Sequence, residues 1–307
     1  MLYVNGQKNK LGCFYMNDAV IVKRDDFNKL LKDLNNSDWS VRVKTVYKLK
    51  EYDDPVAINA LFEKLKNEDN ENVWLSTVNV LKDKKDQRII EPLVKTLLED
   101  KRDELRWHSA YILGEMGDPS TTDHIIKALS DNCLEVRINS AKALGKIGNK
   151  KAIDALMKAL DDENPVVRKE AIASLNRLSP NKEIDTLVKS LSDNDKGVRS
   201  LAAILIAKSN AKENVADLIK ILDDKEIVVR MSAIYALSKL GGSEVVDPLI
   251  KALRDPYWEV RGDAAKALGK IEDSKAVVPL LELLSDENSY VRKSALKALE
   301  RFKIFKK

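Results

Sequence analysis

One dipeptide, an apolar residue followed by arginine, recurs along this 307-residue chain at a nearly constant spacing. From Arg106 to Arg292 the arginines lie 31 residues apart at every step, and Arg42 precedes Arg106 by 64 residues, which is two periods of 32. Val73-Trp74 marks the midpoint of that longer interval, so tryptophan replaces arginine there. A fixed period of about 20–50 residues indicates an array of similar structural units.

Acidic and leucine positions keep the same register as the arginines. An aspartate lies six residues before each arginine from Arg106 onward, whereas repeats one and two have Asn36 and Glu68 there. These aspartates are Asp100, Asp131, Asp162, Asp193, Asp224, Asp255 and Asp286. We expect the aspartate to accept backbone N–H groups at the start of a helix. We expect the arginine to donate to that aspartate or to the one in the next repeat.

Each unit has the pattern of two helices joined by a short turn. The segment 247–253 (DPLIKAL) carries apolar residues at helical spacing, and 260–271 (VRGDAAKALGKI) follows the turn. Small residues in the second helix allow neighbouring helices to approach closely. Gly117, Gly148 and Gly241 are placed to end second helices in the left-handed conformation.

The repeat predicts an all-α fold, a right-handed α-α superhelix of nine two-helix repeats of 31–32 residues. We assign residues 25–307 to this solenoid. Residues 1–24 do not fit the repeat, and two short apolar runs, 2–4 and 19–22, are typical of strands. We therefore expect an N-terminal cap over the first hairpin.

The pattern D-x5-R followed by A-A-x-A-L-G-x-I-G is nearly intact at 131–148, and it departs at Glu272 in the segment 255–272. The chain thereby resembles HEAT repeats, specifically the short HEAT-like type first described in phycobilin lyases (PBS lyases), over residues ~25–301. The resemblance implies a fold and leaves the function open, because the family includes chromophore lyases, iron-dependent hydroxylases and plain scaffolds. Hydroxylases of this type carry several His-Glu pairs. The two histidines here, His108 and His124, are not followed by glutamate, so no di-iron site is predicted.

Composition narrows the function classes further. Net charge is +4, which gives the whole molecule no strong attraction to polyanions. Cys13 and Cys133 form neither a disulfide framework nor a zinc-ligand cluster, and a reduced cytoplasmic setting fits best. We find no transmembrane run, signal peptide, phosphate-binding loop or catalytic constellation. The chain is therefore expected to be non-enzymatic, without cofactor or metal.

In this family the second helices line the concave face, at positions one, two, five and nine after the arginine. Large apolar and aromatic side chains gather there in two places, and such clusters are typical of protein-binding surfaces. The predicted partner-binding residues are Tyr47, Trp74, Trp107, His108, Tyr111, Ile138, Met231, Tyr235 and Trp258. For Leu201 and Ile204, packing into the core between repeats is an equal alternative.

Position nine changes sign along the chain. It is acidic in the first three repeats, at Glu51, Asp83 and Glu115, and basic in repeats four to nine. The resulting basic stripe is Lys146, Arg177, Lys208, Lys239, Lys270 and Arg301. A cationic stripe can follow phosphates or an acidic protein segment. Cations near helix C-termini are also favoured by the helix dipole alone.

Three functions follow in order of preference. The first is a protein-binding scaffold that holds a helix or an extended segment on the concave face. The second is nucleic-acid binding through the basic stripe. The third, far behind, is a subunit of a chromophore lyase or another modifying enzyme.

Overall fold

The structure is a computed structural model that describes residues 26–52, 54–84, 86–179 and 184–302. Within these ranges every regular element is a helix. Residues 26–33 are helical, and the helices that follow are α2 (Trp39–Leu49), α3 (Pro55–Asn67), α4 (Glu71–Asp83), α5 (Ile90–Glu99), α6 (Asp103–Met116), α7 (Thr122–Ala128), α8 (Leu134–Ile147), α9 (Ile153–Lys158), α10 (Pro165–Leu178), α11 (Ile184–Ser190), α12 (Lys196–Lys208), α13 (Val215–Lys220), α14 (Ile227–Leu240), α15 (Val246–Ala252), α16 (Trp258–Ile271), α17 (Val277–Glu282) and α18 (Ser289–Leu299). The expected cap over residues 1–24 lies outside the described residues.

Short 3-10 turns flank many of the first helices. They span Gln87–Ile89, Pro119–Thr121, Lys150–Ala152, Ala159–Asp161, Lys212–Asn214, Ile221–Asp223, Ser243–Val245, Ser274–Ala276 and Leu283–Ser285. The turns before the second helices are closed by side-chain caps in several repeats, because a helix start leaves backbone N–H groups without partners. Asp195 accepts from the backbone N–H groups of Gly197 and Val198, for example.

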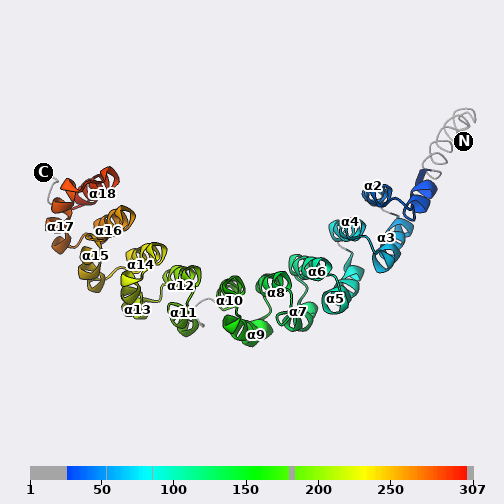
Figure 1. Cartoon of the computed structure of the whole chain (residues 1–307), viewed down its shortest axis with the longest axis horizontal. Coiled ribbons are helices and arrows are strands. Elements are labelled where there is room, and N and C mark those ends of the chain that lie inside the picture. Colours follow the sequence, from blue (N-terminus) through cyan, green and yellow to red (C-terminus); the bar gives the residue numbers. More distant parts are fainter. Residues whose placement is uncertain (1–25, 53, 85, 180–183, 303–307) are drawn as a thin grey trace, which may run out of the picture. The chain divides into compact units, whose positions relative to one another are not determined.

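Contacts divide the chain into two compact units, residues 1–128 (unit 1) and 129–307 (unit 2). In each unit the first helices form one layer and the second helices form the other (Figure 1). The second helices that the structure describes are α2, α4 and α6 in unit 1, and α8, α10, α12, α14, α16 and α18 in unit 2. The predicted all-α architecture of about nine two-helix repeats is thus confirmed.

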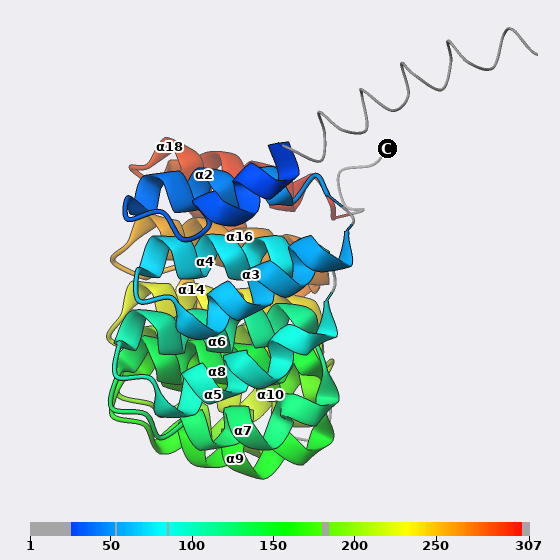
Figure 2. The same ribbon diagram turned by 90° about the vertical axis from the view of Figure 1, so that its right-hand side faces the viewer.

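In unit 2 successive second helices pack against one another far more extensively than successive first helices do, and α2 and α4 in unit 1 are packed in the same way. The pair α4 and α6 is the exception, because it is in looser contact than the first helices α5 and α7. In unit 1, α2 and α4 lie side by side (Figure 2). In unit 2 the approach requires small residues. A Cβ added at Gly145 would lie 2.3 Å from the Ser174 hydroxyl, and one at Gly269 would lie 2.6 Å from the Ala298 backbone. The second-helix layer is therefore the tightly packed one, with its core formed by buried Leu, Val, Ile and Ala side chains.

The predicted helix ends are confirmed at three glycines. Gly241 ends α14 at φ 70°, but its ψ of −161° lies outside the left-handed helical conformation expected there. Gly117 and Gly148 end α6 and α8 in that conformation, with φ of 69° and 77°. Glu272 ends α16 in the same left-handed region, at φ 59°. Because a side chain makes this conformation costly, that joint keeps the repeat's geometry without the glycine that favours it.

Candidate binding surfaces

The turns of unit 2 are tied together by one recurring arginine contact. Arg199 donates from Nε and Nη2 to the two carboxylate oxygens of Asp224 in the next repeat, at 2.7 and 2.9 Å. Its Nη1 donates to the carbonyl oxygens of Asp193 and Asn194 in its own turn, at 2.6 and 3.0 Å. Each such aspartate also accepts a backbone N–H two residues later, as Asp224 does from Glu226. Of the two expected acceptors, the arginine therefore uses the aspartate of the next repeat.

We call this set of contacts the arginine ladder. Its rungs are Arg137–Asp162, Arg168–Asp193, Arg199–Asp224, Arg230–Asp255 and Arg261–Asp286. The hydrogen bonds that Arg261 donates to Asp286 lower the pKa of Asp286 below its usual value, and the same bonds raise the pKa of Arg261. At Asp224 burial alone would raise the pKa, but the hydrogen bonds from Arg199 and the backbone outweigh it and lower the pKa. The carboxylates of Asp224 and Asp286 are therefore ionised at neutral pH, and the charges of the ladder are engaged in structure.

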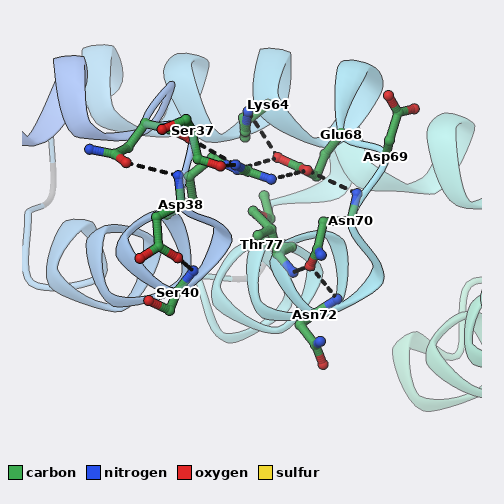
Figure 3. Close-up of polar contacts among 12 residues, drawn as sticks. Ser37, Asp38, Ser40, Lys64, Glu68, Asp69, Asn70, Asn72 and Thr77 are labelled. Carbon is green, nitrogen blue, oxygen red and sulfur yellow. Dashed lines mark hydrogen bonds and ion pairs between the residues drawn. The ribbon is translucent and has the colours of Figure 1, made fainter.

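Unit 1 begins with a variant of the same rung. Arg42 donates to both carboxylate oxygens of Glu68, at 3.1 and 2.9 Å, over a separation of 26 residues rather than the 25 of the later rungs. Glu68 also pairs with Lys64 at 2.8 Å and accepts the backbone N–H of Asn70 (Figure 3). The glutamate thus takes the place of the aspartate found in later repeats.

The joint at Trp74 is built differently. Trp74 occupies the arginine position, and its side chain is only 3% exposed. The carboxylate that an arginine there would bind, Asp100, is held instead by Arg102 from its own turn, at 2.9 and 2.8 Å. Arg102 also donates to the carbonyl oxygen of Asp69 at 2.7 Å, which is one of the carbonyls that an arginine at position 74 would take. Sequence reasoning missed Arg102, which stands where five other repeats have an Asn or Asp that caps the second helix.

In unit 1 the second-helix face presents exposed tyrosines. By second-helix face we mean the side of the second helices that carries positions one, two, five and nine after the arginine. Tyr47 is 51% exposed and Tyr111 is 39% exposed, on α2 and α6. Trp107 and His108 are half-buried and stack on each other, with ring centroids 3.4 Å apart. Trp74 is not part of this exposed surface, because its indole packs into the joint described above.

The second-helix face of unit 2 has its own apolar residues. Tyr235 is 41% exposed on α14, and Met231 is half-buried one turn earlier. Leu201 and Ile204 on the neighbouring α12 are half-buried. Their side chains are therefore neither fully exposed nor fully packed into the core between repeats, which were the two alternatives for them. Ile138 on α8 is half-buried as well.

Trp258 lies at the start of α16 and is 41% exposed. Its ring packs edge-on against Tyr290 of the following repeat, with centroids 5.2 Å apart. Tyr290 also donates a hydrogen bond from its hydroxyl to Asp263 at 2.9 Å and contacts the ammonium group of Lys266. Part of the Trp258 surface is thus used to join two repeats.

The six residues of the basic stripe all lie in unit 2 and are all exposed. Lys146, Lys208, Lys239 and Lys270 lie in the last turns of their helices, as does Arg177. Arg301 follows α18 and approaches Glu272 at 3.7 Å. The acidic residues at the same position, Glu51, Asp83 and Glu115, lie in unit 1 and are exposed. Each unit therefore carries its own sign of charge at position nine.

A groove on the first-helix side of unit 1 was not predicted. It has a volume of about 650 Å³ between α3 and α5, and its lining includes Phe62, Trp74, Pro92 and Lys95. A groove of about 610 Å³ lies between α13 and α15 in unit 2. Because the same groove occurs between first helices of both units, it follows from the looser packing of that layer. The tryptophan in the arginine position is the one sequence signal that marks the unit 1 groove.

No group of three or more His, Cys, Asp or Glu side chains is arranged to hold a metal ion in the part of the chain that the structure describes. Among the same residues no helix combines the length and apolarity needed to cross a membrane.

The stacked helical hairpins and their tied turns define an α-solenoid repeat protein. A family model described as HEAT repeats matches residues 61–133, 90–176, 122–204, 184–256 and 246–304. These overlapping matches span most of the sequence, and the chain belongs to the HEAT-repeat family.

Solved structures share this fold at low sequence identity. E. coli YibA is 22% identical with a TM-score of 0.59, and the match covers 83% of this chain and 95% of YibA. A chain in the complex of Kap95p with RanGDP is 14% identical with a TM-score of 0.65, over 97% of this chain and 48% of that one. The Kap95:Nup1 complex gives 13% identity and a TM-score of 0.65, over 97% and 49%. No curated protein sequence matches the chain.

Proposed function

We propose that this protein is a non-enzymatic scaffold that binds another protein through the second-helix faces of its repeats. The observation that carries the proposal is the exposure of tyrosines at position five of repeats one, three and seven, namely Tyr47, Tyr111 and Tyr235. Tyrosines provide large amphipathic contact areas and are frequent hot spots in protein interfaces. The Kap95 structures are of complexes with Ran and with Nup1, so this fold supports protein binding elsewhere. A helix or an extended segment is the kind of partner we propose.

Two finer assignments belong to the same proposal. The quoted repeat pattern supports membership of the PBS-lyase type of HEAT-like repeats. A reduced cytoplasmic location is consistent with two cysteines distant in sequence.

The test is capture of partners from source-cell lysate by the purified protein, with and without nuclease, followed by identification of the captured proteins. We expect a partner that survives nuclease treatment and is lost when Tyr47 and Tyr111 are replaced by alanine. The matched control is Val56→Ala, which truncates an apolar residue 53% exposed on the first helix α3. Equal capture by the tyrosine variant and the control would reject the proposed surface in unit 1.

A second candidate is nucleic-acid binding, which is favoured by the six exposed cations of the basic stripe. Phosphate contacts release counterions, so affinity would fall steeply as salt rises. Reversal of Lys208, Lys239 and Lys270 to glutamate would abolish that binding. A capture that disappears with nuclease would favour this function over the scaffold.

A further inference from the structure

The basic stripe is unusual in unit 2 because most of its charge is not used to hold the fold together. The ladder arginines are bonded to aspartates and carbonyls, as described above. Within the described chain, by contrast, Arg177, Lys208 and Lys270 have no carboxylate partner, and Lys239 contacts only the ring of Tyr235, at 6.0 Å. A row of exposed cations without internal partners attracts a polyanionic or acidic ligand.

An apolar row runs beside the middle of this stripe. Ile204 and Tyr235 lie four residues before Lys208 and Lys239 on the same helices. The half-buried Leu201 and Met231 pack partly against the core and present the rest of their surface to the row. Four residues of α-helix advance by about 6 Å, so the two rows lie side by side on one face. Any ligand that covers both must present charge on one side and apolar groups on the other.

We propose that the second-helix face of unit 2 binds an acidic amphipathic helix of a partner protein. The partner lies across α12 and α14 with its apolar side chains on Ile204, Met231 and Tyr235, and its carboxylates reach the basic stripe. This inference rests on the proposed scaffold function and adds the chemistry of the partner. It uses the general mode in which an amphipathic helix lays its apolar face on a complementary surface.

Spacing supports a helix in this role. Packed helices lie about 8–10 Å apart, so successive cations of the stripe are separated by roughly that distance. Seven residues of a helix advance by about 10.5 Å, so acidic residues repeated at every seventh position meet successive cations and stay on one side. Such a sequence also leaves a neighbouring stripe free for apolar residues that contact Tyr235 and Ile204.

The apolar row favours protein over nucleic acid. Phosphates gain nothing from Leu201, Ile204 or Met231, and burying a charged backbone against them is costly. Base stacking needs aromatic platforms, and of these four side chains only Tyr235 is aromatic. A carboxylate-bearing amphipathic helix satisfies both rows at once.

The experiment measures binding of a fluorescent helical peptide of about three heptads, with glutamate at every seventh position beside a leucine stripe. A second peptide has lysine in place of each glutamate, and a short DNA duplex serves as the nucleic-acid probe. We expect the acidic peptide alone to bind. Lys208→Glu with Lys239→Glu and, separately, Tyr235→Ala should each weaken binding at least about tenfold. Added salt should weaken it further, by screening exposed charges.

The matched control reverses the same amount of charge on the other layer. Lys158→Glu with Lys189→Glu changes exposed lysines in the last turns of first helices α9 and α11, and peptide binding should remain as in the unchanged protein. Circular dichroism verifies that all variants are folded. Failure of the acidic peptide to bind overturns the inference, as does equal binding by both double variants. DNA binding that is stronger and unaffected by Tyr235→Ala overturns it in favour of nucleic acid.

The outcomes also separate this inference from the scaffold function. Partner capture that resists nuclease and persists in the Lys208→Glu, Lys239→Glu variant leaves the scaffold intact and rejects the acidic helix. If the acidic peptide binds but no partner protein is captured, the result supports the acidic-helix inference and counts against the scaffold function.

Discussion

In unit 2 the turn before each of five second helices, from α8 to α16, is tied by the ladder arginine of that helix. In unit 1 the turn before α4 is tied instead by an arginine of the following repeat. Arg199 reaches from α12 to its own turn and forward to Asp224. Arg102 sits beside Asp100 and reaches backward to the carbonyl of Asp69. In both cases a guanidinium group links a turn carbonyl to the carboxylate of the next turn. The same link between neighbouring turns can thus be made by an arginine of the second helix or by an arginine of the following turn.

The two solutions differ in burial. The side chains of Arg199 and Asp224 are 6% and 11% exposed, whereas those of Arg102 and Asp100 are 33% and 20% exposed. The buried indole of Trp74 occupies the arginine position, and it needs no acidic partner. The unit 1 joint therefore depends more on apolar packing and less on a buried ion pair.

The largest effect should come from Trp74→Ala. Removing a buried tryptophan loses its burial energy and enlarges the adjoining groove, at a cost of about 3–4 kcal/mol. Hydrogen exchange in α4 and α5 would report the loss locally, which suits a repeat array better than one global unfolding transition. The double variant Trp74→Arg, Arg102→Ala restores a ladder arginine at position 74 and removes its substitute. If the arginine contacts alone stabilised this joint, the double variant would be as stable as the natural protein. We expect it to be less stable, because the indole's apolar contacts are not replaced.

Arg199→Ala should rank second. It leaves the Asp224 carboxylate largely buried without its partner and frees two turn carbonyls, and a cost of about 2–3 kcal/mol is expected. The measurement is urea unfolding together with hydrogen exchange across α12 and α14. Arg292→Ala provides the control, because Arg292 is exposed and its Nη1 donates to two turn carbonyls, those of Asp286 and Glu287. Equal losses in the two variants would mean that the aspartate link contributes little.

Arg102→Ala should have a smaller effect, of about 1 kcal/mol, because this pair is more exposed to solvent and the indole remains in place. Glu226→Ala changes the same turn position in unit 2, where the side chain makes one exposed contact with Lys196, and should be nearly neutral. Thermal unfolding of the two variants tests the difference. A neutral Arg102→Ala would show that Trp74 alone maintains the joint.

The repeat period made most of this architecture predictable. D-x5-R at fixed spacing predicted the turns and their acid–base contacts, and the glycines predicted three helix ends. Arg102 was missed by such reasoning. The position four before the arginine is Asn or Asp in five of the nine repeats, where it caps the second helix, and an arginine there gives no sign that it replaces the missing ladder contact. The burial of Trp74 was not predicted, because the sequence placed it among the partner-binding residues; it is buried because it replaces a side chain that points toward the turn. The division between residues 128 and 129 has no counterpart in the period, which continues through it. The proposed binding residues rest on exposure and position.

The smallest predicted effect is on how the stability of unit 1 depends on pH in the acid range. Hydrogen bonds from Arg102 lower the pKa of Asp100, so the folded state holds its proton less tightly than the unfolded chain. The stabilisation is therefore fully present above the unfolded pKa of about 3.9 and is lost as pH falls through the folded pKa. Removing Arg102 raises the pKa of Asp100 toward its usual value, and stability in unit 1 should then depend less on pH below about 4. Hydrogen exchange of α4 and α5 at pH values on either side of this range measures the change.

The same variant should leave the acid response of unit 2 unchanged, since Asp193, Asp224 and Asp286 keep their ladder arginines and their lowered pKa values. Hydrogen exchange of α12 and α16 in the same samples provides this internal control. An unchanged pH dependence in unit 1 would mean that the Asp69 carbonyl contact, rather than the pairing with Asp100, is what Arg102 contributes to the joint.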